Sequence, residues 1–137
     1  MSGPENTFIR SVHKHLPAGV YFMKNHNVYC GGVPDVWYSA KADLWVEYKF
    51  IEVPVRDATV IDIIGGKKPS LSVLQQEWLR ARTAEGRRTG VIIGSASGGV
   101  WLPKLSWSQP ITALTFRNNM VDRKTLAKII SEQVGGL

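Results

Sequence analysis

Three charged residues have the types and spacing to bind a metal ion and act on a phosphate group. Eleven residues separate Asp35 from Glu47, and Lys49 follows two positions later. Glu47 and Lys49 share one face of a strand predicted over residues 44–52, where an uncompensated charge among apolar residues would be costly. A strand predicted over residues 35–39 would pair with it as a hairpin and bring Asp35 within reach of Glu47. Neighbouring carboxylates repel unless they share a proton or a cation, so we expect a hard divalent ion, Mg2+ or Mn2+.

The elements that must position these residues are typical of an α/β domain. Residues on the second face of the 44–52 strand form a plain core face, and Trp37 and Trp45 alternate as core residues would. Ser72 and Gln75 form a capping box at the start of a helix that Gly86 ends. Residues 58–64 fit a short strand or a helix, and residues 65–68 a mobile loop. Helices are also predicted over residues 5–16 and 121–134, and strands over residues 20–24, 89–95 and 100–102.

The order of these elements predicts one domain over residues 1–137, with a mixed β-sheet flanked by helices. Composition agrees, because 44% of the residues are hydrophobic and 20% are charged, which excludes a disordered chain. The single cysteine, Cys30, excludes a disulfide framework and is expected to be a small apolar residue. The histidines His13, His15 and His26 are expected to be surface residues or to have satisfied hydrogen bonds.

The motif around the acidic pair resembles a known signature. Gly32-Val33-Pro34-Asp35, followed by Glu47-Tyr48-Lys49, resembles the PD-(D/E)XK nuclease superfamily. The Gln-bearing segment 71–79 and the strand 89–94 resemble the VRR-NUC-like branch, and Glu5 matches the N-terminal helical Glu of many members. This resemblance covers about residues 4–103, with 104–137 as a C-terminal helical extension. It implies a restriction-endonuclease-like core, although the segment 53–69 is longer than compact members need.

The resemblance also implies roles for individual residues. Asp35, Glu47, the Tyr48 backbone carbonyl and Glu5 would hold Mg2+, with Mn2+ as a substitute, or Glu5 would instead act as a base. Lys49 would orient the attacking water or stabilise charge on the phosphate, and Gln75 would steady the water or the phosphate. Asp35, Glu47, Lys49, Gln75 and Glu5 are the candidate catalytic residues.

Simpler structural roles stand beside these assignments. Asp35 could cap a turn after a proline, and Glu47 and Lys49 could form a same-face ion pair. Gln75 is already explained by the capping box with Ser72. Glu5 lies in the first helical turn, where the helix dipole favours any acid.

The distribution of charge predicts a polyanionic partner. The chain carries a formal charge of +6, and residues 67–88 hold six Lys and Arg against two Asp and Glu. Residues 36–66 hold three against five, so an acidic stretch precedes a basic one. DNA phosphates would bind such a basic stretch, although a solvated helix face would have a similar composition. The candidate DNA-binding residues are Lys67, Lys68, Arg80, Arg82, Arg87 and Arg88.

These observations lead to a functional hypothesis. We expect a Mg2+-dependent DNA endonuclease that is selective for branched DNA, resembles junction resolvases and acts as a homodimer through its apolar C-terminal third. The alternatives are a non-catalytic DNA-binding accessory module of the same fold and a restriction or defence nuclease with sequence preference. Without a membrane span or a signal-peptide pattern, we expect a soluble cytoplasmic protein of bacterial or phage origin.

Overall fold

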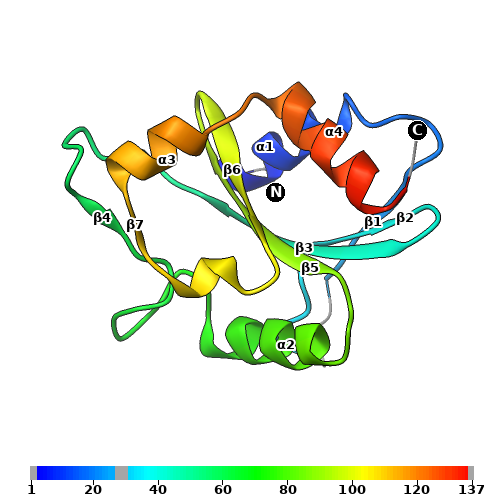
Figure 1. Ribbon diagram of the computed structural model, residues 1–137, viewed down its shortest axis with the longest axis horizontal. Coiled ribbons are helices and arrows are strands. Elements are labelled where there is room, and N and C mark those ends of the chain that lie inside the picture. Colours follow the sequence, from blue (N-terminus) through cyan, green and yellow to red (C-terminus); the bar gives the residue numbers. More distant parts are fainter. Residues whose placement is uncertain (1–2, 27–30, 136–137) are drawn as a thin grey trace.

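A computed structural model describes residues 3–26 and 31–135 and has a five-stranded sheet at its centre (Figure 1). The strands lie in the order β1, β2, β3, β5 and β6. β3 and β5 are parallel, and the other neighbouring pairs of this sheet are antiparallel. The fold is therefore α/β with a mixed sheet, as predicted. The strand bounds are Tyr21–Lys24 (β1), Val36–Ser39 (β2), Asp43–Phe50 (β3), Thr89–Ser95 (β5) and Gly98–Pro103 (β6).

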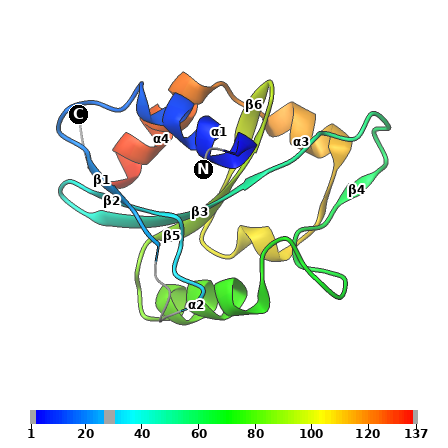
Figure 2. The same ribbon diagram turned by 180° about the vertical axis from the view of Figure 1, so that it is seen from behind.

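Helices cover both faces of this sheet. α1 (Pro4–His13) and α4 (Arg123–Gln133) lie on one face, and α2 (Val73–Ala84) lies on the other (Figures 1 and 2). Because parallel strands need a crossover connection, the chain leaves β3, passes through α2 and returns as β5. The remaining elements are β4 (Val60–Ile61), which pairs with β7 (Ile111–Thr112), a 3-10 turn over Ser106–Ser108, and α3 (Ala113–Asn119).

The two faces of the sheet have separate hydrophobic cores. Leu44, Val46 and Tyr48 of β3 are fully buried against α1 and α4, as the alternation predicts, and Phe50 is partly buried there. The second core lies on the α2 side and contains Leu79, together with Val91 and Ile93 of β5. β5 serves both cores because every one of its residues is buried. The sheet is thereby fixed from both sides.

The C-terminal third takes part in these cores. The core between the sheet and α1 contains Leu126, Ile130 and Val134 of this third. The core on the α2 side of the sheet contains Trp107. Their apolar surface is therefore already covered within the chain and is not available to a second copy. Among residues 3–26 and 31–135, no helix combines the length and apolar composition needed to cross a bilayer.

Trp37 and Trp45 do not lie in either core, and their prediction as core residues was wrong. Both are half-buried on the α2 face, where their rings stack with centroids 6.0 Å apart. The alternation along the strands is correct, but α2 covers only part of that face. Alternation along a strand shows which side chains share a face of the sheet. Whether that face is buried depends on which elements pack against it.

Several boundaries differ from the predicted ones. α1 ends at His13 because the amides of His15 and Leu16 bond three residues back, a tighter turn that leads to Pro17. α4 begins at Arg123 because the Asp122 side chain accepts the Thr125 amide at 2.7 Å. The open segment 53–69 contains the two-residue strand β4 and is otherwise loop. α3 and β7 were not predicted, and Asn27 and Cys30 lie outside the described residues.

Candidate active site

The β2–β3 hairpin places Asp35 directly beside Glu47. Val36 pairs with Val46, so Asp35 is the next residue beyond the end of β2, opposite Glu47. The Asp35 amide donates to Glu47 Oε1 at 3.1 Å, and the Tyr48 amide donates to Asp35 Oδ2 at 2.9 Å. These two bonds replace the ladder where the strands diverge. They hold the two carboxylates together in the arrangement that the hairpin predicts.

The Tyr48 backbone also faces this site. Along β3, the amides of Trp45 and Ile51 bond toward β5, whereas the Tyr48 amide points the other way, to Asp35. The amide and the carbonyl of one strand residue face the same side, so the Tyr48 carbonyl points toward the Asp35 side of the strand as well. This carbonyl is thus placed to supply a third oxygen beside the two carboxylates.

Lys49 and Gln75 meet at the second oxygen of Glu47. Lys49 Nζ lies 3.0 Å from Glu47 Oε2, and Gln75 Nε2 donates to the same oxygen at 2.8 Å. Glu47 is only 1% exposed, so these contacts compensate a carboxylate that has almost no water around it. The predicted ion pair is present, and it belongs to the same cluster as the candidate metal ligands.

Gln75 completes the capping box and also contacts the candidate active site. Its side-chain oxygen accepts the Ser72 amide at 2.9 Å, and Ser72 Oγ accepts the Gln75 amide at 3.2 Å, which completes the capping box. Its side-chain nitrogen remains available and donates to Glu47. The start of α2 therefore positions an amide in the site, and the capping and site functions do not compete.

A glycine allows the start of α2 to approach the hairpin. Gly32 has a φ of +88°, in the left-handed region that favours glycine. A Cβ at this position would collide with the backbone carbonyl of Leu74 in α2. Gly32 of the Gly-Val-Pro-Asp motif thus serves close packing of the Asp35 segment against α2.

Burial raises the pKa of all three acids in this region. The pKa of Glu47 rises to about 8, first because of burial and then because of the nearby Asp35 charge, against the opposing effect of Lys49. Burial also raises the pKa of Asp35, although the bond from the Tyr48 amide counteracts this. A divalent ion would counteract both shifts, because its positive charge favours the ionised form of the two carboxylates.

Glu5 lies at the edge of the site. It is in the first turn of α1, and its pKa is raised by burial and then by the Asp35 charge, with Lys49 acting in the opposite direction. Within the described residues, no group of three or more His, Cys, Asp or Glu side chains is arranged to hold a metal ion. The structure therefore gathers Asp35 and Glu47 as a pair and leaves Glu5 outside a three-carboxylate cluster.

The donor set of this site suits Mg2+. This ion usually binds through one or two carboxylates and keeps several of its waters, so Asp35, Glu47 and the Tyr48 carbonyl are a sufficient protein contribution. Oxygen donors alone also favour Mg2+ or Mn2+ over softer ions. Lys49 and Gln75 would remain beside the ion as donors to a phosphate or a water.

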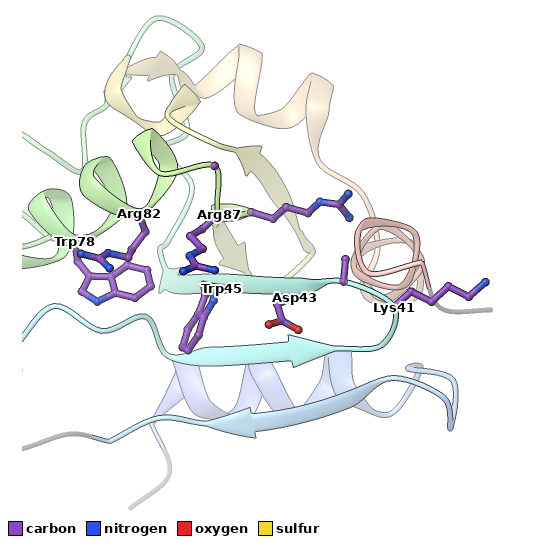
Figure 3. Close-up of a pocket in the computed structure, with 9 residues that line it drawn as sticks. Lys41, Asp43, Trp45, Trp78, Arg82 and Arg87 are labelled. Atoms are coloured by element: carbon purple, nitrogen blue, oxygen red, sulfur yellow. The ribbon is translucent and has the colours of Figure 1, made fainter.

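The candidate DNA-binding residues fall into two groups. Lys67 and Lys68 are exposed in the loop before α2. Arg82, Arg87 and Arg88 lie at the other end of α2 and line one pocket together with residues of the β2–β3 hairpin (Figure 3). Both groups therefore flank α2, which carries Gln75.

Arg80 has a different environment from these residues. Its guanidinium lies 4.8 Å from the centre of the Trp107 ring, on which it stacks. Trp107 belongs to the core on the α2 side of the sheet, so Arg80 helps to cover that core. Among the six candidate DNA-binding residues, Arg80 is the one whose position least favours binding to a phosphate.

The pocket in Figure 3 is lined by Trp45, which was predicted to be a core residue, and by Trp78 of α2. Trp45 and Trp78 contact each other there, with ring centroids 5.4 Å apart. The sequence contained a signal for the position of Trp45, because Trp45 lies on the same face of β3 as Glu47 and Lys49. A large aromatic side chain on the face of a candidate active site is as well explained by substrate contact as by the core.

The architecture defines a class of fold. An α/β core with a mixed sheet, covered by α1 on one face and α2 on the other, is consistent with a restriction-endonuclease-like fold. Among solved structures, the chain is similar to that of Hjc, a Holliday junction resolvase from the archaeal hyperthermophile Archaeoglobus fulgidus. The TM-score is 0.54 at 13% sequence identity, over 90% of this chain and 98% of that chain. No family model matches the sequence, and no curated protein sequence matches it.

Proposed function

We propose that this protein is a Mg2+-dependent endonuclease that hydrolyses phosphodiester bonds in DNA. The observation that carries the proposal is the cluster of Asp35, Glu47 and Lys49, in which two carboxylates and an ammonium group converge at the end of a buried hairpin. An acid pair beside a lysine is suited to the hydrolysis of a phosphate diester. The similarity to a structure described as a Holliday junction resolvase supports the same class of reaction.

Each side chain has a role that follows from its position. Asp35, Glu47 and the Tyr48 carbonyl would hold Mg2+, which supplies Lewis acidity at the phosphate and lowers the pKa of a bound water. Lys49 would then donate to a phosphate oxygen or hold the attacking water. Gln75, fixed through its oxygen by the Ser72 amide, would present its nitrogen to the same group. Glu5 lies where it could accept a proton at the edge of the site.

We infer further that the substrate is branched DNA and that the protein acts as a homodimer. The resolvase similarity supports the first point, and a symmetric branch is best addressed by two copies of one site. Because the C-terminal third is used internally, we favour the edge strand β1 as the interface. Its Tyr21, Phe22 and Met23 are large apolar residues with 57%, 41% and 43% of their surface exposed.

The alternatives share the fold and differ in chemistry or recognition. A non-catalytic DNA-binding module would not need Glu47 and Lys49 buried together beside Asp35, so their contacts favour catalysis. A restriction or defence nuclease would use the same site with a sequence preference. A map of cleavage positions on random-sequence duplex and on branched DNA separates these two recognition modes.

The test is cleavage of plasmid and four-way-junction DNA with Mg2+ and with a chelator. We expect cleavage only with the metal, and a loss of about 100-fold or more in Asp35→Ala and Lys49→Ala, because transition-state stabilisation is removed. Glu52→Gln is the matched control, since Glu52 is an exposed acid just beyond β3. Absence of cleavage with both Mg2+ and Mn2+, or full activity of Lys49→Ala, contradicts the proposal.

A second readout separates metal binding from catalysis. Mn2+ should raise the melting temperature of the wild type and of Lys49→Ala, because a ligand that binds only the folded state stabilises it. Asp35→Ala should not respond. A DNA-binding module without a metal site would show no shift in any of these proteins.

A further inference from the structure

A pocket of about 640 Å3 lies at the C-terminal end of α2 (Figure 3). It is lined by Asp43 and Trp45, which share their face of β3 with Glu47 and Lys49. At about 3.3 Å per strand residue, Trp45 and Glu47 lie roughly 7 Å apart along β3. DNA rises about 3.4 Å per nucleotide of one strand, so a strand bound at the carboxylates passes the pocket within a few nucleotides.

The wall of this pocket is aromatic. The rings of Trp45 and Trp78 contact each other at 5.4 Å between centroids, and Trp37 stacks behind Trp45. Both Trp45 and Trp78 are half-buried, so one part of each ring is fixed by packing and another part borders the pocket. Such rigid aromatic surfaces stack on unpaired bases without regard to sequence. Bases in an intact duplex are already stacked and cannot use them.

The rim of the pocket is cationic, and its arginines differ in availability. Arg82 forms an ion pair with Glu85 at 3.1 Å, and Arg88 donates to the backbone carbonyl of Gln133. The Arg87 side chain is exposed and forms no hydrogen bond or ion pair with any residue that the structure describes, although its backbone amide donates to the Arg82 carbonyl. In Figure 3, the Arg87 side chain points toward Trp45, whereas Lys41 points away from the pocket. Arg87 is therefore the cation best placed to bind a phosphate next to a stacked base.

We propose that this pocket binds one unpaired nucleotide of the DNA, with its base on Trp45 and Trp78 and its phosphate on Arg87. This inference rests on the proposed function, because it takes DNA as the ligand. A volume of about 640 Å3 is within the usual range for ligand pockets, roughly 300–1,000 Å3. The pocket would direct the nuclease to DNA whose pairing is interrupted near the scissile phosphate.

The test is binding, measured in EDTA by fluorescence anisotropy, of a blunt 20-bp duplex and of the same duplex with a five-thymidine extension. We expect the wild type to bind the extended DNA about tenfold more tightly, the effect of one stacked base with its phosphate contact. Arg87→Ala should bind the extended DNA no more tightly than the blunt duplex. Arg56→Ala is the control, because Arg56 is exposed in the loop after β3. Equal affinity of the wild type for both DNAs, or a preference that persists in Arg87→Ala, overturns the inference.

A second variant tests the stacking itself. Trp45→Phe keeps an aromatic ring in the packing position but reduces the stacking surface, so the preference for extended DNA should fall and blunt-duplex binding should persist. An unchanged preference in this variant would exclude Trp45 as the stacking platform and contradict the inference.

Failure of the pocket and failure of the proposed function give different results. A protein that cleaves DNA but shows no preference for the extension has the nuclease site without the nucleotide pocket. A protein that binds neither DNA in EDTA and cleaves neither with Mg2+ contradicts both.

Discussion

At the scale of single residues, the site and the core meet in a chain of buried hydroxyl groups. His13 Nε2 lies 2.7 Å from the Tyr38 hydroxyl, which bonds in turn to the Tyr48 hydroxyl. Tyr48 is the residue whose backbone faces Asp35, so its side chain is anchored on one side of the sheet while its backbone borders the site. The expectation that His13 is a histidine with satisfied hydrogen bonds is confirmed. Its partners could not be read from the sequence, because they lie on β2 and β3.

His13 gives a prediction about stability and pH. Burial, and then the Lys24 charge, lower the pKa of His13 from 6.5 to about 4. Between these values the unfolded chain binds the proton more readily than the folded protein, so His13 lowers stability as the pH falls from about 6.5 to about 4. We expect urea unfolding to show a loss of about 1–2 kcal/mol between pH 7 and pH 5 from this group.

The control is a comparison of variants, since the raised pKa of Glu47 acts in the opposite direction over part of this range. His13→Gln retains a hydrogen-bonding side chain for Tyr38 and should lack the His13 contribution to the pH dependence. His15→Gln, at an exposed position, should keep it. The same pH dependence in His13→Gln and the wild type would contradict the assignment.

At the scale of elements, α2 connects helix formation to the site. The capping box was predicted from Ser72 and Gln75 alone, because it depends on residues three positions apart. The bond from Gln75 to Glu47 could not be predicted in this way, since it joins residues 28 positions apart and depends on the crossover between β3 and β5. α3 was not predicted, although the Thr112 side chain caps it. The helix has only seven residues, which is too few to show a helical repeat of apolar positions.

Ser72→Ala should therefore affect both stability and catalysis. The substitution removes the hydroxyl that accepts the Gln75 backbone amide, which should cost about 1 kcal/mol in the free energy of unfolding. Fraying of the first turn of α2 should then displace Gln75 and reduce cleavage by about tenfold or more. Asp122→Ala removes the corresponding cap of α4, on the opposite face of the sheet, and should cost a similar stability without changing the cleavage rate. Chemical denaturation and single-turnover cleavage of both variants provide the measurement. Equal activity of the two variants would show that Gln75 has a capping role alone.

At the scale of the whole molecule, the two faces of the sheet carry different groups of residues. α1 and α4 lie on one face and α2 on the other (Figures 1 and 2). The α1 and α4 face encloses the larger core, and the α2 face carries the acid pair, the aromatic pocket and most of the candidate cations. The order of helices and strands and the hairpin were predictable, because local patterns determine them. The half-buried state of Trp37 and Trp45 was not, because it depends on how far α2 extends over the sheet.

This division predicts an asymmetric response to salt. In EDTA, DNA affinity should fall as salt rises, with a slope proportional to the number of phosphates contacted. A Lys67→Ala and Lys68→Ala double variant should reduce the slope by about 2, one for each phosphate contact. Lys124→Ala with Lys128→Ala, two exposed positions on α4, should leave the slope unchanged. Equal effects of the two double variants would contradict the assignment of the α2 face to DNA.

The contacts of Glu47 have a consequence for how metal and DNA would enter the site. Both of its oxygens are already bonded within the chain, one to the Asp35 amide and the other to Lys49 and Gln75. An ion at this site would therefore have to replace donors of the protein as a partner of Glu47. Scissile phosphate oxygens would offer Lys49 and Gln75 new acceptors at the moment of exchange. Ion and DNA should therefore bind cooperatively, each tightening the other by the same factor.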